Sequence, residues 1–343
     1  MSLVLTVQRT AWYRHVLATL EAYGGSEIVI PVVKGNGYGF GRSSLVRRAL
    51  EVGGPGVGGR FGLALGTVHE AAGLAGSVSP LMVLTPEIGH LPPHLAADTV
   101  LTVGSAEHVA NLARQGWEGA VVVKLRSSMR RYGVEATHLD ALLAAVRTAR
   151  CHVVGYSLHL PLAGDDTARI DEVRQWLAHL DPELPLALGH LGPAAFADLR
   201  QQHVARTFMM RLGTALWHGD KSALYLGATV ADRHRVVAGE RLGYHQVPAP
   251  VTGHVVVVAA GTAHGVLPHD GGASPLHFGR RRLALVEPPH MHTTLAIVPD
   301  GDPCPEVGDQ VDVQCPLTRV DVDEVIWLGE PDEGRASPPP PPR

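Results

Sequence analysis

The stretch Val32-Val33-Lys34-Gly35-Asn36-Gly37-Tyr38-Gly39-Phe40-Gly41 decides the fold of this chain. The run Ser26–Val33 is rich in β-branched residues and predicts a strand that ends on Lys34. Four glycines among residues 35–41 then permit a tight turn and a close approach of the backbone to a ligand. A plainer interpretation stays open, in which a Gly-rich turn follows the strand and Lys34 lies at the surface.

Outward from this stretch, short β-branched runs alternate with helical patterns from about residue 12 to about residue 220. The predicted strands are Ser26–Val33, Leu81–Leu84, Ala120–Leu125 and His152–Leu158, and the predicted helices are Ser43–Val52, Glu107–Gln115, Leu139–Arg150 and Ile170–Leu180. Such alternation is typical of parallel βα units, and their number favours a (β/α)8 TIM-type barrel. The C-terminal ends of its strands form the active face, so Lys34 is expected to point into a site.

After about Asp220 the pattern changes to Val-rich alternating segments separated by Gly, Pro and Asp turns. These segments are Ala228–Val237, Val251–Ala259, Arg282–Val286, Thr293–Val298 and Gln310–Val313. We therefore expect an α/β barrel at residues 1–222, a C-terminal mostly antiparallel β domain at 223–333 and a Pro-rich tail at 334–343. The first strand, Leu3–Val7, is expected to pack with the second domain.

Composition restricts the possible partners. A net charge of -4 gives no electrostatic reason to expect nucleic acid or an anionic membrane, so the expected ligand is small. The longest apolar runs, such as Val255–Gly261, are too short to span a bilayer, and the first residues lack a signal-peptide pattern, which favours a cytoplasmic location. Three scattered cysteines and 20 dispersed histidines predict neither a disulfide framework nor a metal site.

Lysine usage draws attention to the same stretch. Lysine occurs only at positions 34, 124 and 221, and arginine supplies all the other cations. Because lysine can lose its proton near neutral pH and form a Schiff base, a lysine kept in such a background suggests amine chemistry.

The stretch of residues 32–41 resembles the cofactor-lysine motif of the alanine racemases, pyridoxal-phosphate enzymes of fold-type III. The resemblance implies that Lys34 carries pyridoxal 5'-phosphate and that Tyr38 binds its phosphate. The segment Lys124-Leu125-Arg126-Ser127-Ser128-Met129-Arg130-Arg131-Tyr132-Gly133 is similar to a second family segment. It implies that Arg131 hydrogen-bonds the cofactor phenolate and that Lys124 is the lysine often found carbamylated.

Two further segments extend the resemblance over the first 220 residues. In Gly155-Tyr156-Ser157-Leu158-His159, the histidine would pack against the cofactor ring; in Phe208–Trp217, Arg211 would face the pyridine nitrogen, with Gly213 and Thr214 also near the cofactor. Gly192 and Pro193 stand where the family has a phosphate-binding Asn-Ser pair. An arginine such as Arg211 beside the pyridine nitrogen leaves that nitrogen an unprotonated acceptor, which favours proton transfer at Cα. Taken singly, His159 is also explained as a core histidine, and Arg131 and Arg211 as solvated or ion-paired.

Departures from the family pattern lie in the second domain. The opposing catalytic tyrosine is replaced by Thr262 and the aspartate two residues later by His264. The substrate-pocket methionine is kept as Met291, but the aspartate after it has become His292. An aliphatic hydroxyl does not exchange a proton near neutral pH without an adjacent base, whereas a phenol with a pKa near 10 does.

Three functions remain open. In the first, the protein is a one-base enzyme acting on a D-amino acid or related amine, with Lys34 as base and His264 or His292 of a partner subunit as surrogate acid. In the second, it is a catalytically inactive binding or regulatory homologue. In the third, residual alanine racemisation remains. The resemblance also implies a homodimer, because each pocket of the family is completed by the other subunit.

Overall fold

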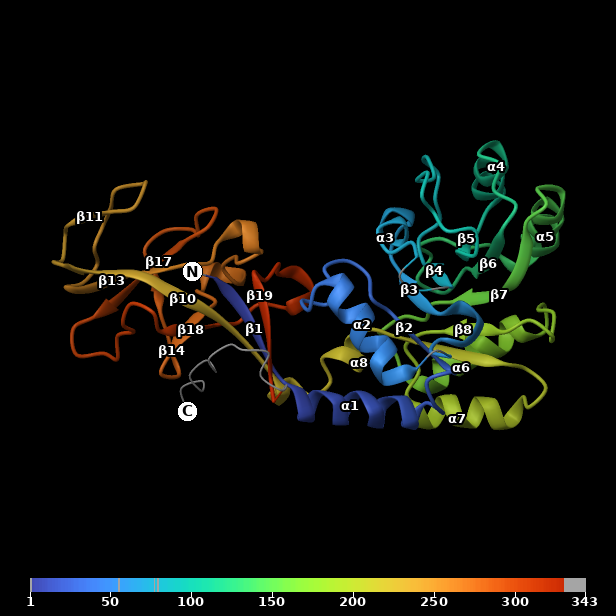
Figure 1. The fold of residues 1–343 in the computed structure, drawn as a ribbon, viewed down its shortest axis with the longest axis horizontal. Helices are drawn as coiled ribbons and strands as arrows, with labels where there is room; N and C mark the ends of the chain where they lie inside the picture. Colours follow the sequence, from blue (N-terminus) through green and yellow to red (C-terminus); the bar gives the residue numbers. More distant parts are fainter. Residues whose placement is uncertain (1, 55, 77, 79, 330–343) are drawn as a thin grey trace. The chain divides into compact units, whose positions relative to one another are not determined.

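A computed structural model of the protein describes residues 2–54, 56–76, 78 and 80–329 (Figure 1). The chain forms two compact units, and each is described by itself. The barrel unit comprises residues 15–35 and 42–219, and the β unit comprises the described residues of 1–14, 36–41 and 220–343. The Pro-rich tail predicted at residues 334–343 lies outside the described residues. The boundary predicted at residue 222 stays a prediction.

In the described part of the barrel unit, eight parallel strands form a closed ring. They are β2 (Val29–Pro31), β3 (Leu63–Leu65), β4 (Leu81–Val83), β5 (Leu101–Val103), β6 (Ala120–Leu125), β7 (His152–Leu158), β8 (Leu186–Leu188) and β9 (Phe208–Leu212). Ladders join β3 to β4 and run from β5 through β9 to β2. Parallel bridges between Val32 and Ala64 and between Met82 and Val100 close the two remaining junctions. The predicted TIM-type barrel is confirmed.

Helices alternate with these strands, except that none of the described residues between β4 and β5 is helical. They are α1 (Arg9–Ala22), α2 (Arg42–Gly53), α3 (Val68–Ala72), α4 (Ala106–Arg114), α5 (Leu139–Thr148), α6 (Asp166–Leu177), α7 (Pro193–Gln202) and α8 (Thr214–Trp217), with short 3-10 turns η1 (Gly59–Phe61), η2 (Ala136–His138), η3 (Lys221–Ala223), η4 (Thr262–His264), η5 (Asp270–Gly272) and η6 (Leu317–Arg319). Side chains of Thr67, Ser105 and Asp165 accept hydrogen bonds from the amide three residues ahead and define three helix starts. None of the helices in the described part of the chain combines the length and the apolar character needed to cross a membrane.

The predicted barrel elements agree with the structure to different degrees. Strands β6 and β7 have the predicted bounds, and every residue of β6 is buried, as a parallel strand covered on both faces requires. The prediction Ser26–Val33 was too long, because the amides of Ile28 and Val29 donate to the carbonyl of Gly25 in a turn, and after Pro31 only the bridge at Val32 continues the pairing. Helix α6 begins at Asp166 rather than Ile170, since Asp165 caps it. Strands of three residues, such as β3 and β8, are too short to show a period.

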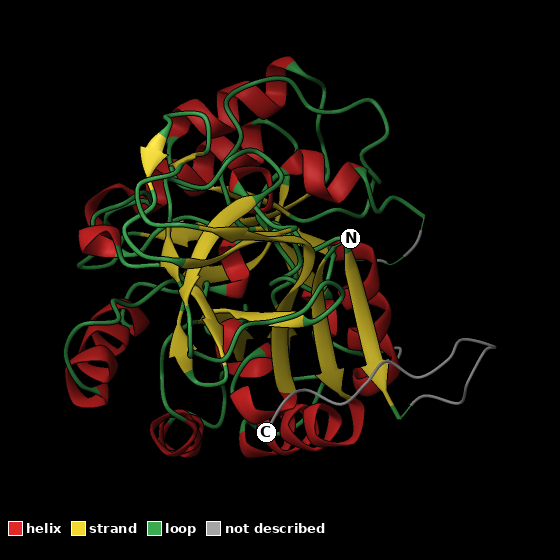
Figure 2. Cartoon of the chain, turned by 90° about the vertical axis from the view of Figure 1, so that its left-hand side faces the viewer, coloured by secondary structure: helices red, strands yellow, loops and turns green. Residues whose placement is uncertain are grey.

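The β unit is built on one large sheet, drawn among the yellow arrows of Figure 2. Its described strands are β1 (Leu3–Gln8), β10 (Leu224–Val236), β13 (Gly253–Val258), β14 (Leu276–Phe278), β15 (Arg281–Arg282), β16 (Ala284–Leu285), β17 (Thr294–Pro299), β18 (Gln310–Val313) and β19 (Glu324–Leu328), beside the separate hairpin of β11 (Arg241–Leu242) and β12 (Val247–Pro248). The order is β15-β14-β18-β10-β13-β17-β16, with β1 on β10 and β19 on β1. The pairs are antiparallel except β1 with β19, so the predicted mostly antiparallel domain is confirmed.

Two predictions in this unit had different outcomes. The strand expected at Leu3–Val7 pairs with β10, as the sequence indicated. The single strand expected at Arg282–Val286 was wrong, because β15 pairs with β14 whereas β16 pairs with β17. The chain leaves one partner for another at the buried residue Leu283.

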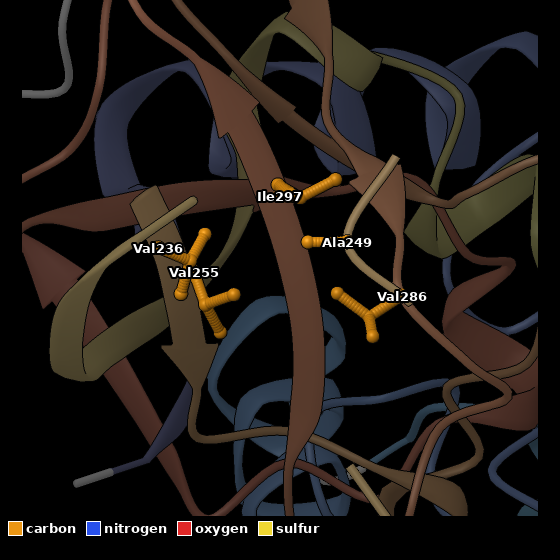
Figure 3. Packing of buried hydrophobic residues seen from close by; sticks show 5 residues of the cluster. All are labelled: Val236, Ala249, Val255, Val286 and Ile297. Atoms are coloured by element: carbon orange, nitrogen blue, oxygen red, sulfur yellow. The ribbon is translucent and has the colours of Figure 1, made fainter. Parts of the chain in front are cut away.

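A compact apolar cluster in the β unit consists of Val236, Ala249, Val255, Val286 and Ile297 (Figure 3). Leu242 and Val247 of the β11–β12 hairpin pack against it. Burial of the cluster gives the second unit a hydrophobic core of its own, to which β10, β13 and β17 contribute one side chain each.

We expect Ile297→Ala to lower the free energy of unfolding by about 3 kcal/mol, because the side chain is 2% exposed and its removal leaves a cavity. Urea denaturation followed by circular dichroism measures the change. The control Val307→Ala, at a position 59% exposed, is expected to change stability by about 0.5 kcal/mol or less. Equal effects of the two substitutions would show that this cluster does not form the core.

Candidate active site

The parallel ring directs the C-terminal ends of all its strands to one mouth, and the predicted site residues of the barrel unit lie there. Lys34 follows β2, Lys124 is the penultimate residue of β6, His159 follows β7, and Arg211 is the penultimate residue of β9. Arg131 lies in the loop after β6. The closed topology thus gathers side chains that are up to 177 residues apart in sequence, from Lys34 to Arg211.

The backbone of Gly35, the residue after Lys34, is hydrogen-bonded at both its amide and its carbonyl. Glu70 accepts hydrogen bonds from the amides of Gly35 (3.0 Å) and Gly66 (2.7 Å). Arg42 donates to the carbonyl of Gly35 at 3.2 and 2.9 Å. Partial burial lowers the pKa of the Lys34 ammonium, as do the charges of Arg131 and Arg211, while Glu70 acts in the opposite direction. The Lys34 amine therefore has an enhanced neutral fraction, as a nucleophile requires.

Arg211 is buried and connects three neighbouring strands. One guanidinium nitrogen donates to the carbonyl of Leu158 at 2.8 Å and lies 3.4 Å from Nδ1 of His159. Its Nε lies 3.4 Å from the carbonyl of Leu188. Burial lowers the pKa of Arg211 to about 10, so the guanidinium stays protonated at neutral pH and remains a donor.

Positive charge accumulates at this mouth. Lys124 is 4% exposed, and burial, then Arg211 and Arg131, depress its pKa well below the usual range. The guanidinium of Arg131 lies over the Tyr132 ring at 4.8 Å. Among the described residues, Glu70 is the one carboxylate that acts appreciably on Lys34. Such a cluster stabilises an anionic ligand.

His190, which the sequence analysis missed, lies beside His159. The two ring centroids are 4.4 Å apart, and Nδ1 of His190 lies 2.8 Å from the carbonyl of Leu160. Burial lowers the pKa of both histidines, and so does the charge of Arg211. Lys34 and Arg169 also lower the pKa of His190, which locates this residue within the same charged mouth. Both rings are therefore neutral at physiological pH.

The residues expected near a phosphate have mixed surroundings. Gly192 caps α7, and its amide donates to Oδ2 of Asp166 at 3.0 Å. Pro193 follows as the first residue of α7 and has no amide hydrogen. Gly213 and Thr214 lie at the start of the short helix α8. Asp166 was not anticipated from the sequence.

Tyr38 belongs to the β unit, in the segment 36–41. It is buried and has a left-handed φ of 55°, and the glycines at positions 35, 37, 39 and 41 all have positive φ as well. A side chain on Gly39 would come within 3.0 Å of Leu317, and Asn36 donates to the carbonyl of Leu317 at 2.8 Å. The glycines are thus needed for the turn itself. The phosphate-binding role of Tyr38 stays a prediction.

The four site residues expected in the β unit lie near one another. The amide of Thr262 donates to the carbonyl of His290 at 2.8 Å, and the rings of His264 and His292 are 5.8 Å apart. Nδ1 of His264 accepts from the amide of Gly261 at 3.1 Å, while Nε2 lies 3.4 Å from Asp323. Both nitrogens of His264 therefore have partners. Thr262, His292 and Met291 are exposed.

Glu287 organises the loop that carries these residues. Its buried carboxylate accepts from the amides of Tyr244 (2.9 Å) and His245 (3.0 Å). It also contacts ring nitrogens of His245 (2.7 Å) and His290 (2.6 Å). Burial acts to raise the pKa of Glu287, but these hydrogen bonds outweigh burial and lower the pKa to about 2. The carboxylate fastens the β11–β12 hairpin to the loop before Met291.

For one of the missed residues, Glu70, the sequence contains a local signal, whereas for the others it contains none. Thr67 and Glu70 have the spacing of a capping box, which predicts a helix start but not the support of Gly35. Nothing local distinguishes Asp166 or Glu287 from surface carboxylates, because their partners are 26 and 42 to 43 residues away.

Comparison with known proteins identifies relatives over most of the chain. The family model described as "Alanine racemase, N-terminal domain" matches residues 9–221. The chain is 26% identical to the alanine racemase of Mycobacterium tuberculosis over 351 residues, covering 92% of this chain and 84% of the relative. It is 29% identical to that of Beutenbergia cavernae over 292 residues, covering 77% and 75%.

The fold is similar to that of solved alanine racemases. The structure from Bartonella henselae, which is described with covalently bound pyridoxal phosphate, has a TM-score of 0.71 at 16% identity and covers 96% of this chain and 100% of that one. At this identity the likeness shows a common fold: a TIM barrel followed by a β domain.

Because its pKa is lowered in the folded protein, Glu287 is expected to make the free energy of unfolding of the β unit fall as the pH becomes acidic. A carboxylate whose pKa is lowered on folding stabilises the native state above its ordinary pKa, and this contribution is lost as the pH falls. We expect the loss between about pH 4.5 and about pH 2, as protonation removes the hydrogen bonds to His245 and His290. Thermal unfolding from about pH 6 downward, compared between wild type and Glu287→Gln, measures it.

The Glu287→Gln variant is expected to unfold at a lower temperature at neutral pH and to lose less stability on acidification. The control Glu306→Gln, at an exposed carboxylate paired with Arg233, is expected to keep the wild-type pH dependence. A Glu287→Gln variant with the wild-type pH dependence would contradict this role of Glu287.

Proposed function

The chain belongs to the alanine racemase family, and we propose that it binds pyridoxal 5'-phosphate through Lys34 with an altered active site. The observation that carries this proposal is the convergence of Lys34, Arg131 and Arg211 at one mouth of the barrel, where partial burial and the two cationic neighbours lower the pKa of the lysine. A neutral amine is the form that attacks an aldehyde carbon.

The residues present fit the aldehyde and ring portions of this cofactor. Arg131 provides positive charge for a phenolate oxygen, and Arg211 provides a protonated donor for a ring nitrogen. The neutral His159, 3.4 Å from Arg211, is placed to pack against an aromatic ring and to keep the guanidinium in position. When bound, the cofactor supplies an electron sink that acidifies the Cα–H bond of an attached amino acid.

In the proposed reaction, Nζ of Lys34 removes a proton from Cα and returns it to the same face. Thr262, where the family has its opposing tyrosine, offers an aliphatic hydroxyl and cannot serve as the second acid. Of the two histidines beside it, His292 is the better surrogate, because both ring nitrogens of His264 already have partners. The substrate class is a D-amino acid or related amine, with Met291 and His292 lining its pocket.

We extend the proposal to a homodimer that acts in the cytoplasm. The β-unit residues Thr262, Met291 and His292 are exposed, and a second copy of the chain would bring them to a barrel mouth. An inactive binding or regulatory homologue is the second candidate. The exposed Thr262, in place of a catalytic phenol, is the observation that favours it.

Lys34→Ala is expected to abolish covalent cofactor binding, because the other lysine at the mouth, Lys124, is buried whereas Lys34 is exposed. The measurement is the absorption spectrum of purified protein with added pyridoxal 5'-phosphate, before and after borohydride reduction, followed by mass spectrometry of the labelled peptide. The control Lys221→Ala, which removes an exposed lysine of the β unit, is expected to bind as the wild type does. A label that persists on the Lys34→Ala variant would refute the assignment.

Solvent deuterium exchange separates the candidate functions. One-base chemistry predicts cofactor-dependent exchange of the Cα proton with retained configuration, measured by NMR and chiral chromatography on a panel of D- and L-amino acids. Exchange is expected to vanish in Lys34→Ala. Its complete absence in the wild type would favour the inactive homologue, and inversion as fast as exchange would favour a residual racemase.

A further inference from the structure

The loops after the seventh and eighth strands are where (β/α)8 barrels frequently hold phosphate groups, together with a nearby helix N-terminus. With β2 counted as the first strand, these are the loops from β8 to α7 and from β9 to α8. His190 at the end of β8 is influenced by the charge of Lys34, so the β8–α7 loop borders the proposed cofactor site.

In this chain the start of α7 is already engaged by a carboxylate of the same unit. Asp166, the first residue of the neighbouring helix α6, accepts the Gly192 amide at 3.0 Å through Oδ2. Its Oδ1 lies 2.9 Å from Arg169. A β-carbon on Gly192 would come within 2.6 Å of Oδ2, so glycine is what permits this approach. Pro193 has no amide hydrogen to add.

Arg169 fixes the carboxylate in this place. Besides Asp166, the guanidinium donates to the carbonyls of Pro161 (2.9 Å), Leu162 (2.6 Å) and Gly164 (2.9 Å). These bonds order the whole loop between β7 and α6. The charge of Asp166 also acts on Tyr23, which contacts the loop between β8 and α7. Burial and then Asp166 raise the pKa of Tyr23, whose hydroxyl donates to the carbonyl of Leu191 at 2.8 Å.

We propose that Asp166 is a specificity-determining residue that occupies the N-terminus of α7 and discriminates against a phosphate group there. This inference rests on the proposed function and deepens it. The carboxylate takes the amide that a phosphate oxygen would need and repels the dianion by its charge. Lys34 and the arginines therefore supply most of the affinity, and the phosphate group of the cofactor adds little.

The test compares pyridoxal 5'-phosphate with pyridoxal, which has the same aldehyde and ring but no phosphate. Dissociation constants for both are measured by absorbance on the full chain, for wild type, Asp166→Asn and Asp171→Asn. Asparagine keeps an oxygen that can accept from Gly192 while removing the charge. Asp171 is the matched control, because it lies on α6 and pairs with Arg174 at 3.1 Å as Asp166 pairs with Arg169, but it is exposed.

We expect Asp166→Asn to strengthen binding of pyridoxal 5'-phosphate by about ten-fold while leaving binding of pyridoxal unchanged. Asp171→Asn is expected to alter neither. Equal effects of Asp166→Asn on the two ligands, or no effect on either, would overturn the inference while leaving the proposed function intact. Circular dichroism and the thermal unfolding midpoint verify that each variant is folded.

Inorganic phosphate provides a second measurement that does not depend on Lys34. Isothermal calorimetry is expected to detect tighter phosphate binding by Asp166→Asn than by wild type or Asp171→Asn. If neither aldehyde reacts with Lys34 in any variant, the proposed function is wrong, and this titration alone then decides the inference. Identical phosphate binding by the three proteins would overturn it.

Discussion

The buried guanidinium of Arg211 is the interaction on which the barrel mouth depends. It donates to the carbonyl that ends β7, approaches the carbonyl that ends β8, and contacts the ring of His159. A buried cation is costly unless its donors have partners, and here backbone carbonyls accept from the guanidinium, while no carboxylate in the described part of the chain forms an ion pair with it. The positive charge is therefore not neutralised. Burial lowers the pKa of Lys34, Lys124, His159 and His190, and the charge of Arg211 lowers each of them further.

This arrangement explains how one mouth can combine a nucleophilic amine with permanent cations. Lysines lose their protons more readily beside Arg131 and Arg211, whereas the guanidinium groups keep theirs. Glu70 opposes the effect on Lys34 only partly, since burial and the two arginines all act in the other direction. Asp166 is a carboxylate that faces the N-terminus of α7 and accepts a hydrogen bond from the Gly192 amide. The charges thus divide the mouth into a cationic part and a part with a built-in anion.

The β unit uses a buried carboxylate in the opposite way. Glu287 is stabilised by two amides and two imidazoles, so its charge is fully hydrogen-bonded and holds two loops together. The loop after it carries Met291 and His292 and provides the carbonyl that accepts from Thr262. These hydrogen bonds fix the backbone on both sides of the segment that carries Thr262. The family fold alone does not establish the chemistry of the site, so the two must be argued separately.

The sequence by itself determined the class of fold, the glycine-rich turn and the place of Lys34 at the end of a barrel strand. Periodicity is a local property, so β6, β7 and β18 could be bounded from it, and the glycines of residues 35–41 predict the positive φ angles that the turn adopts. Only the tertiary structure decided which strands close the ring, that His190 lies on His159, and that Glu70, Asp166 and Glu287 serve distant amides. The amide that donates to Glu70 lies 35 positions away in the sequence, and the one that donates to Asp166 lies 26 positions away. The two that donate to Glu287 lie 42 and 43 positions away. A carboxylate on a helix or loop has the same local signature whether it faces solvent or a backbone donor, and folding alone brings that donor to it.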